Sequence, residues 1–135
     1  MDRRYLLTAF SYALLGLMLG LYMAASHDHG QLVTHAHIMM IGFLVSFSYA
    51  LCYRLWLEAS SGCHKGGLVM AQFWLHQLGT LGVAIGLFLL YGEFVALEVV
   101  DPFLAVASFS VFGGVVLMMV QLLKTKSAKE EEAKG

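Results

Sequence analysis

The stretch YLLTAFSYALLGLMLGLYMAA (Tyr5–Ala25) contains no charged residue. It is long enough to cross a bilayer as a helix, which takes about 20 apolar residues. Similar runs occur at Val33–Leu57 and Gly67–Tyr91, and a fourth ends at Leu123. Of the 135 residues, 59% are hydrophobic and 13% are charged, whereas a soluble domain has about 25% charged residues. The sequence therefore predicts an all-α polytopic membrane protein, a bundle of four transmembrane helices.

The fourth apolar run is interrupted near its start by Glu98, Asp101 and Pro102. Because proline fits the first turn of a helix, we expect this helix to cover residues 102–123. Glu93, Glu98 and Asp101 are then expected in a short connection outside the membrane.

The basic residues all fall on one side of the membrane if the four helices alternate in direction. They lie before the first helix, beside the connection between the second and third, and after the fourth: Arg3, Arg4, Arg54, Lys65, Lys124, Lys126, Lys129 and Lys134. The opposite loops carry carboxylates and no Lys or Arg. The positive-inside rule therefore predicts cytoplasmic termini in a bacterial inner membrane. The transmembrane domain would cover residues 1–123, and residues 124–135 would form a polar cytoplasmic tail.

Other features restrict the classes of function and the partners. The sequence has no P-loop, dinucleotide-binding fingerprint, zinc-protease motif or serine nucleophile elbow, and no basic patch for nucleic acid. Small residues that let membrane helices approach closely recur at Gly16 and Gly20 and at Gly79, Gly82 and Gly86. We expect lipid and further copies of the chain as partners.

Four of the six histidines occur in SHDHGQLVTHAH, Ser26–His37. His27 and His29 are expected in an external loop, where they are either solvated or ligands of copper or zinc. His35 and His37 begin the second helix, where residues two apart point about 200° from each other. At most one of them is expected to face the bundle, and periodicity does not decide which.

His76 lies about 13 Å along the third helix, near the middle of the bilayer. Ionisable residues at that depth are rare, face the bundle and mark function. Gln72, Gly79, Val83 and Gly86 share its face, so a groove of small residues could admit a flat ring beside the imidazole. The alternative is a neutral histidine bonded to a neighbouring helix, at one of three positions: Ser46, Ser48 or Tyr49. The Cys63–His64 pair is a weaker candidate for a metal.

Two stretches resemble a known family. VTHAHIMMIGFLVSFSYAL (Val33–Leu51) resembles the second helix of the haem-copper oxidase catalytic subunit, and QFWLHQLGTLGVAIGLFLL (Gln72–Leu90) is similar to its third helix. The resemblance implies that His37 is an axial ligand of a low-spin haem. The family's remaining haem and copper ligands come from later helices that this chain lacks. Oxygen reduction by this polypeptide alone is therefore not expected, and no role is transferred to His76.

The leading hypothesis is a membrane protein that binds a b-type haem through His37, with His76 or another histidine such as His35 as second ligand. Its role would be electron transfer, haem handling or sensing, beside a respiratory complex. His37 and His76 differ in depth by about 16 Å in regular, fully spanning helices. A clamp within one chain is therefore strained, and a symmetric oligomer could supply the missing ligand.

Two alternatives belong to other classes. In the first, His27, His29, His35 and His37 form an outward copper or zinc site used in metal handling or oxidase assembly. In the second, the chain is a structural oligomeric module without a cofactor, held together through its glycine faces.

Overall fold

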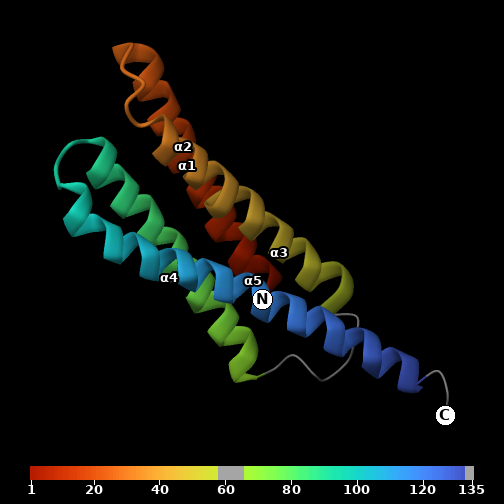
Figure 1. The fold of residues 1–135 in the computed structure, drawn as a ribbon. Helices are drawn as coiled ribbons and strands as arrows, with labels where there is room; N and C mark the ends of the chain where they lie inside the picture. Colours follow the sequence, from red (N-terminus) through yellow and green to blue (C-terminus); the bar gives the residue numbers. More distant parts are fainter. Residues whose placement is uncertain (58–65, 133–135) are drawn as a thin grey trace.

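The computed structural model describes residues 1–57 and 66–132, with side chains as far as Thr125. These residues are helical apart from short connections, and the described part contains no strand (Figure 1). The helices are α1 (Asp2–Ser26), α2 (Leu32–His37), α3 (Ser46–Cys52), α4 (Gly67–Tyr91) and α5 (Leu97–Glu132). Two π-helical segments, Ile38–Val45 and Tyr53–Leu57, join α2 and α3 into one continuous helix, hereafter the second span.

Four helices are long and apolar enough to cross a membrane: Asp2–Ser26, Leu32–Leu57, Gly67–Tyr91 and Leu97–Thr125. Large apolar side chains on their outer surfaces are exposed, among them Leu14 at 63% and Phe109 at 74%. Such a surface is suited to lipid and not to water. The prediction of an all-α chain with four helices long and apolar enough to cross a membrane is confirmed.

The start of α5 differs from the sequence prediction. The helix begins at Leu97 and not at Pro102, so Glu98 and Asp101 lie inside it and Glu93 stays in the connection. Pro102 lacks the N–H that would bond to the Glu98 carbonyl, which removes a single bond near the helix start. The prediction was wrong because it placed the proline in the first turn, whereas the helix tolerates it one turn later.

The second span keeps one straight stripe of buried residues. Buried positions recur every four residues, at Thr34, Ile38, Gly42, Ser46 and Ala50. In a regular α-helix, steps of four residues rotate by about 40° each, so such a stripe would wind around the helix. The wider π-helical turns at Ile38–Val45 offset this rotation. The stripe therefore stays against the same neighbours along the span.

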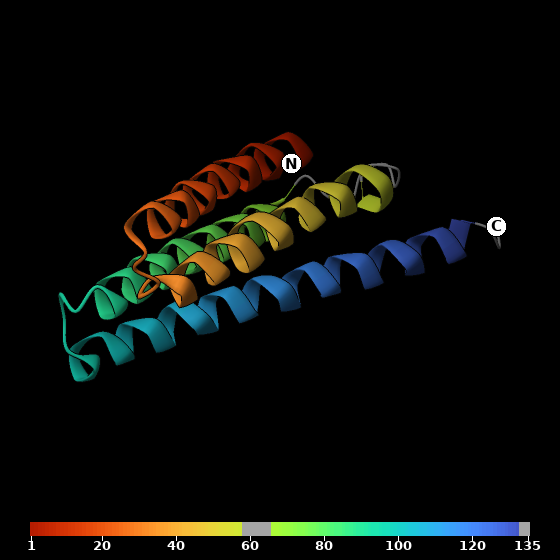
Figure 2. The same ribbon diagram turned by 90° about the horizontal axis from the view of Figure 1, so that it is seen from above.

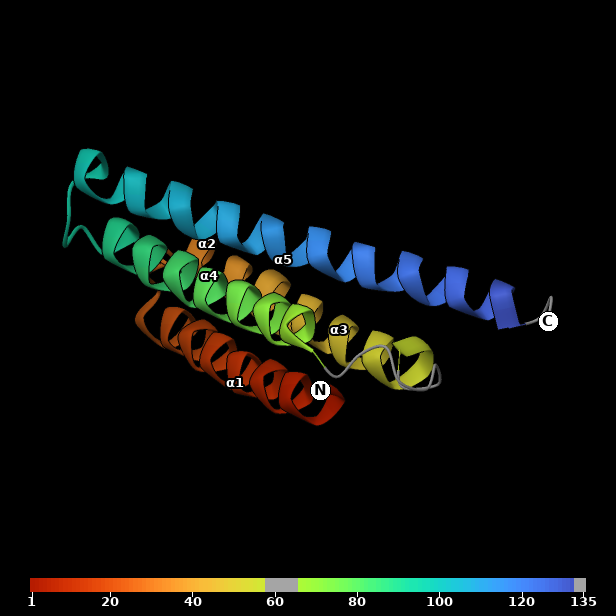
Figure 3. The ribbon, with the colours of Figure 1, turned by 90° about the horizontal axis from the view of Figure 1, so that it is seen from below.

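The second span lies between α1 and α4. It packs against α1 along most of its length, contacts α4 through α2 and Ile38–Val45, and meets α5 near Tyr53–Leu57, while α4 pairs closely with α5. Figures 2 and 3 show α1 and α5 on opposite outer sides of this arrangement. The second span is therefore covered on two faces.

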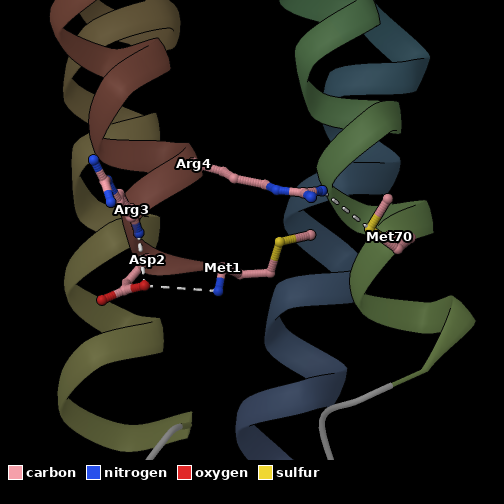
Figure 4. A network of polar contacts seen from close by, with 5 residues as sticks. All are labelled: Met1, Asp2, Arg3, Arg4 and Met70. Atoms are coloured by element: carbon pink, nitrogen blue, oxygen red, sulfur yellow. Dashed lines mark hydrogen bonds and ion pairs between the residues drawn. The ribbon is translucent and has the colours of Figure 1, made fainter.

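Both ends of the described chain lie at one end of the bundle, and the connections after α1 and α4 lie at the other (Figures 2 and 3). The first residues of α1 carry charges at the end with the termini, where Arg4 approaches the Met70 sulfur of α4 at 3.8 Å (Figure 4). The N-terminal amine lies 3.7 Å from the carboxylate of Asp2. Arg3 and Arg54 line one shallow surface at the same end.

Glycines allow α4 and α5 to approach closely. A Cβ added at Gly79 would lie 2.8 Å from the backbone nitrogen of Val111 and 2.9 Å from the carbonyl of Ala107. A Cβ at Gly86 would lie 2.6 Å from the Leu104 side chain. The expected helix-contact role of the α4 glycines is thus confirmed for packing within the chain.

Candidate functional site

A buried polar layer connects all four spans. Tyr5 of α1, Tyr53 of the second span, Gln72 of α4 and Gln121 of α5 are each at most 2% exposed. The Gln72 carbonyl oxygen accepts bonds from the hydroxyls of Tyr5 and Tyr53, and the Tyr53 hydroxyl also lies 3.0 Å from the Gln121 carbonyl oxygen. The Gln72 amide donates to the Gly114 carbonyl at 3.3 Å. Sequence reasoning noted Gln72 and missed the other three, although a glutamine within an apolar span is itself a signal.

His76 is fully buried next to this layer. Its Nε2 lies 3.2 Å from the Ser46 hydroxyl, which also accepts a bond from the Gln77 amide. The Tyr49 ring meets the imidazole edge-on at 4.9 Å between centroids. The alternative interpretation of His76, a bond to a neighbouring helix, is thus present in the structure, at Ser46. Its Nδ1 has no partner among the described residues, nor do two other buried polar atoms, the Tyr49 and Thr80 hydroxyl oxygens.

The groove expected beside His76 is filled. The face through Gln72, Gly79, Val83 and Gly86 is buried as predicted, but α5 occupies it. A Cβ added at Gly114 of α5 would lie 3.0 Å from the Cβ of His76. The small residues admit a helix and leave no room for a flat ring, so this part of the sequence interpretation was wrong.

His35 faces α1. Its Nδ1 lies 2.8 Å from the Gly16 carbonyl oxygen, and a Cβ added at Gly20 would lie 3.1 Å from its Cε1. The two glycines of α1 thus make room for the imidazole. The buried face of the second span, through Gly42, Ser46 and Tyr49, is the one that starts from His35.

His37 faces the opposite way, towards α4 and α5. Its Nδ1 lies 2.8 Å from the Val33 carbonyl oxygen one turn earlier. The ring lines a groove of about 220 Å³ together with apolar residues of three helices: Ile41, Val83, Leu87, Leu104 and Val111, with Ser108 beside them. Both histidines are half-buried. His35 thus lies against α1, and His37 lies in a groove beside α4 and α5, a difference that helical periodicity alone does not decide.

The hydrogen bonds determine how the two rings can act. A carbonyl oxygen has no proton to donate, so each bond requires a protonated Nδ1. In the neutral ring of His35 and of His37, Nε2 then carries the lone pair. A histidine that binds a metal through one nitrogen typically donates the other N–H to an acceptor such as a backbone carbonyl. Both rings are therefore held in the tautomer that leaves Nε2 as a ligand.

The described histidines do not converge on one site. His37 lies beside Val83 and Leu87, whereas His76 is about 10–16 Å earlier along α4. His35 and His37 point to different neighbours, and His27 and His29 are exposed in the loop. Among the side chains of residues 1–57 and 66–125, no three His, Cys, Asp or Glu side chains gather closely enough to hold a metal. Cys63 and His64 lie outside the described residues.

A second hollow lies at the end opposite the termini, between the connection after α1 and the end of α4. It has a volume of about 600 Å³ and is lined by aromatic and acidic side chains, including Tyr22, Tyr91, Asp28 and Glu93. Sequence reasoning treated these residues as an ordinary loop and membrane boundary. The combination of aromatic and acidic residues at both connections was the available signal.

Comparison of the chain with protein-family models, with curated proteins and with solved structures finds no match. The resemblance to the haem-copper oxidase subunit therefore stays a prediction from the sequence.

Proposed function

We propose that this chain is a small inner-membrane protein that binds a b-type haem through Nε2 of His37, at an interface between two copies, for electron transfer, haem handling or sensing. The observation that carries the proposal is the His37 ring itself. Its Nδ1 is bonded to the Val33 carbonyl, so the lone pair of Nε2 is free, and the ring lines an apolar groove. Those are the properties required of an axial ligand in a membrane.

A haem clamped by two histidines of one chain does not fit this arrangement. His76 is enclosed by Ser46, Tyr49 and α5 and lies at a different depth from His37. His35 is turned towards Gly16. Within the described residues, one chain thus offers a single ligand to the groove.

Two copies remove this difficulty. In a two-fold symmetric dimer the same surface of each subunit meets at the axis, so two His37 rings would stand level on opposite sides of one planar group. One groove of about 220 Å³ is smaller than typical ligand pockets of about 300–1,000 Å³. Two facing grooves reach that range, which favours a shared site over one per chain.

The charge distribution supports cytoplasmic termini. The described basic side chains Arg3, Arg4 and Arg54 belong to the end of the bundle at which both ends of the described chain lie. The positive-inside rule places such an end on the cytoplasmic side. The His37 groove then lies nearer the outer surface of the membrane.

The test is an absorption spectrum and iron analysis of the purified protein after growth with added haem precursor. We expect a Soret band and stoichiometric iron in the wild type, both lost in His37→Ala and retained in the matched loop variant His29→Ala. Far-UV circular dichroism checks that His37→Ala remains helical. Stoichiometric copper or zinc without iron would instead support the outward histidine cluster. Absence of both would support a structural module.

A further inference from the structure

The hollow at the end opposite the termini has the features of a small-molecule site. Four aromatic side chains line it: Tyr22 from α1, Phe88 and Tyr91 from α4, and Phe94 from the following connection. Their rings are only partly covered by neighbours, since each side chain is between 41% and 68% exposed. The volume of about 600 Å³ is within the usual range for pockets that hold small ligands, about 300–1,000 Å³.

The charge of the lining is negative. Asp28 and Glu93 both contribute to the wall, and no Lys, Arg or His is among the lining residues. The described Arg and Lys side chains, Arg3, Arg4, Arg54 and Lys124, lie towards the opposite end of their helices. The lining would therefore repel an anionic ligand and attract a cation.

Local contacts hold the walls in place. The Gln31 amide donates to the Phe88 carbonyl at 3.1 Å, which connects the loop after α1 to α4. Phe88 and Phe94 are stacked with centroids 6.0 Å apart. A Cβ at Gly92 would collide with the Phe94 ring, so glycine there allows this stacking. Glu93 adopts a positive φ of 58°, a conformation that favours glycine, and yet it carries a side chain that lines the pocket.

We propose that this pocket binds an ammonium group, primary or quaternary, through its aromatic rings and the carboxylates of Asp28 and Glu93. The faces of Tyr and Phe rings attract organic cations, and cages of several aromatic residues are the usual receptors for quaternary ammonium. The carboxylates supply the opposite charge. The ammonium can come from a lipid headgroup, such as that of phosphatidylethanolamine, or from a soluble organic cation.

The test uses the full chain in nanodiscs of phosphatidylglycerol, which has no ammonium group, titrated with tetramethylammonium chloride by isothermal calorimetry. We expect saturable binding that sodium chloride at the same ionic strength does not abolish. Glu93→Gln and Tyr91→Leu should each weaken it by about fivefold or more. Glu98→Gln is the matched control, because it removes an exposed carboxylate near the same end of the bundle but outside the pocket, and affinity should change less than about twofold.

The outcomes are distinct. No saturable binding by the wild type, equal displacement by sodium, or an equal loss in Glu98→Gln would overturn the proposal. Far-UV circular dichroism identifies a variant that fails to fold, and Phe94→Leu then replaces Tyr91→Leu. Nanodiscs that contain phosphatidylethanolamine separate the two sources. Reduced apparent affinity for tetramethylammonium identifies the lipid headgroup as the occupant, whereas unchanged affinity identifies a soluble cation.

Discussion

Replacement of Gln72 by Met should destabilise the bundle more than any other single loss of a polar group in the layer between the spans. Gln72 makes three hydrogen bonds, with the hydroxyls of Tyr5 and Tyr53 and with the Gly114 carbonyl. The Tyr53 hydroxyl keeps Gln121 as an acceptor at 3.0 Å, so only the bonds to Tyr5 and Gly114 are lost without a substitute. Bonds between membrane helices contribute about 0.6 kcal/mol each on average, which gives about 1 kcal/mol for these two. The fully buried Tyr5 hydroxyl would also lose Gln72 as its acceptor, which costs about 1–3 kcal/mol.

The expected total, about 2–4 kcal/mol, can be compared with Gln121→Met. That variant also removes a buried amide, but the Tyr53 hydroxyl keeps Gln72 as an acceptor, so the loss should be about 1 kcal/mol. The assay is reversible unfolding in mixed micelles, followed by the fluorescence of Trp56 and Trp74.

A double-mutant cycle with Tyr5→Phe isolates the interaction. Once the Tyr5 hydroxyl is absent, Gln72→Met leaves no orphaned donor on α1, so the two losses should couple by about 1–2 kcal/mol. Equal destabilisation by Gln72→Met and Gln121→Met, together with an additive cycle, would refute the layer as a connection among all four spans.

Other predictions concern the packing of α4 against α5 and the role of His76. Gly79→Ala should destabilise the protein by about 1–3 kcal/mol, because its Cβ would lie 2.8 Å from the Val111 backbone nitrogen and α5 would have to move. Gly67→Ala is the control, because no neighbouring atom lies within 4 Å of its added Cβ, and it should leave the stability unchanged in the same micelle assay. Equal destabilisation by the two variants would contradict the close approach of α4 and α5 at Gly79. His76→Ala should lower the free energy of unfolding by about 1–3 kcal/mol, because it leaves a cavity and removes the bond to Ser46. Any Soret band of the wild type should be retained in this variant. Loss of the band in a folded variant would make His76 a haem ligand.

The sequence was sufficient to predict the four spans. Long apolar runs correspond to helices because every backbone polar group in lipid must be bonded internally. The bounds of Gly67–Tyr91 agree exactly with α4, whereas α5 begins before Pro102 and continues beyond the apolar run. The membrane sidedness of the termini stays a prediction from charge.

The orientation of individual side chains was harder to predict. Whether His35 or His37 faces a neighbour depends on which helices flank the second span, and it lies between α1 and α4. The straight buried stripe depends on the π-helical turns of Ile38–Val45, which periodicity based on regular α-helices does not include. The three-dimensional arrangement therefore decides the faces that the helical wheel leaves open.

The difference in depth between His37 and His76 was predictable, because it depends on helix rise alone. The filling of the glycine groove beside His76 was not, since a small-residue face fits a helix and a flat ring equally well in sequence. Here α5 occupies it, with Gly114 against His76. With that space filled, the proposal keeps His37 as the haem ligand and no longer uses His76 as the second ligand.

The central proposal, one haem held between the His37 rings of two copies, is tested most directly by native mass spectrometry of the haem-supplied protein released from gentle detergent. We expect a species of two chains with one haem, and apo-protein alone for His37→Ala. One haem retained by a single chain, or haem retained by folded His37→Ala, would contradict it.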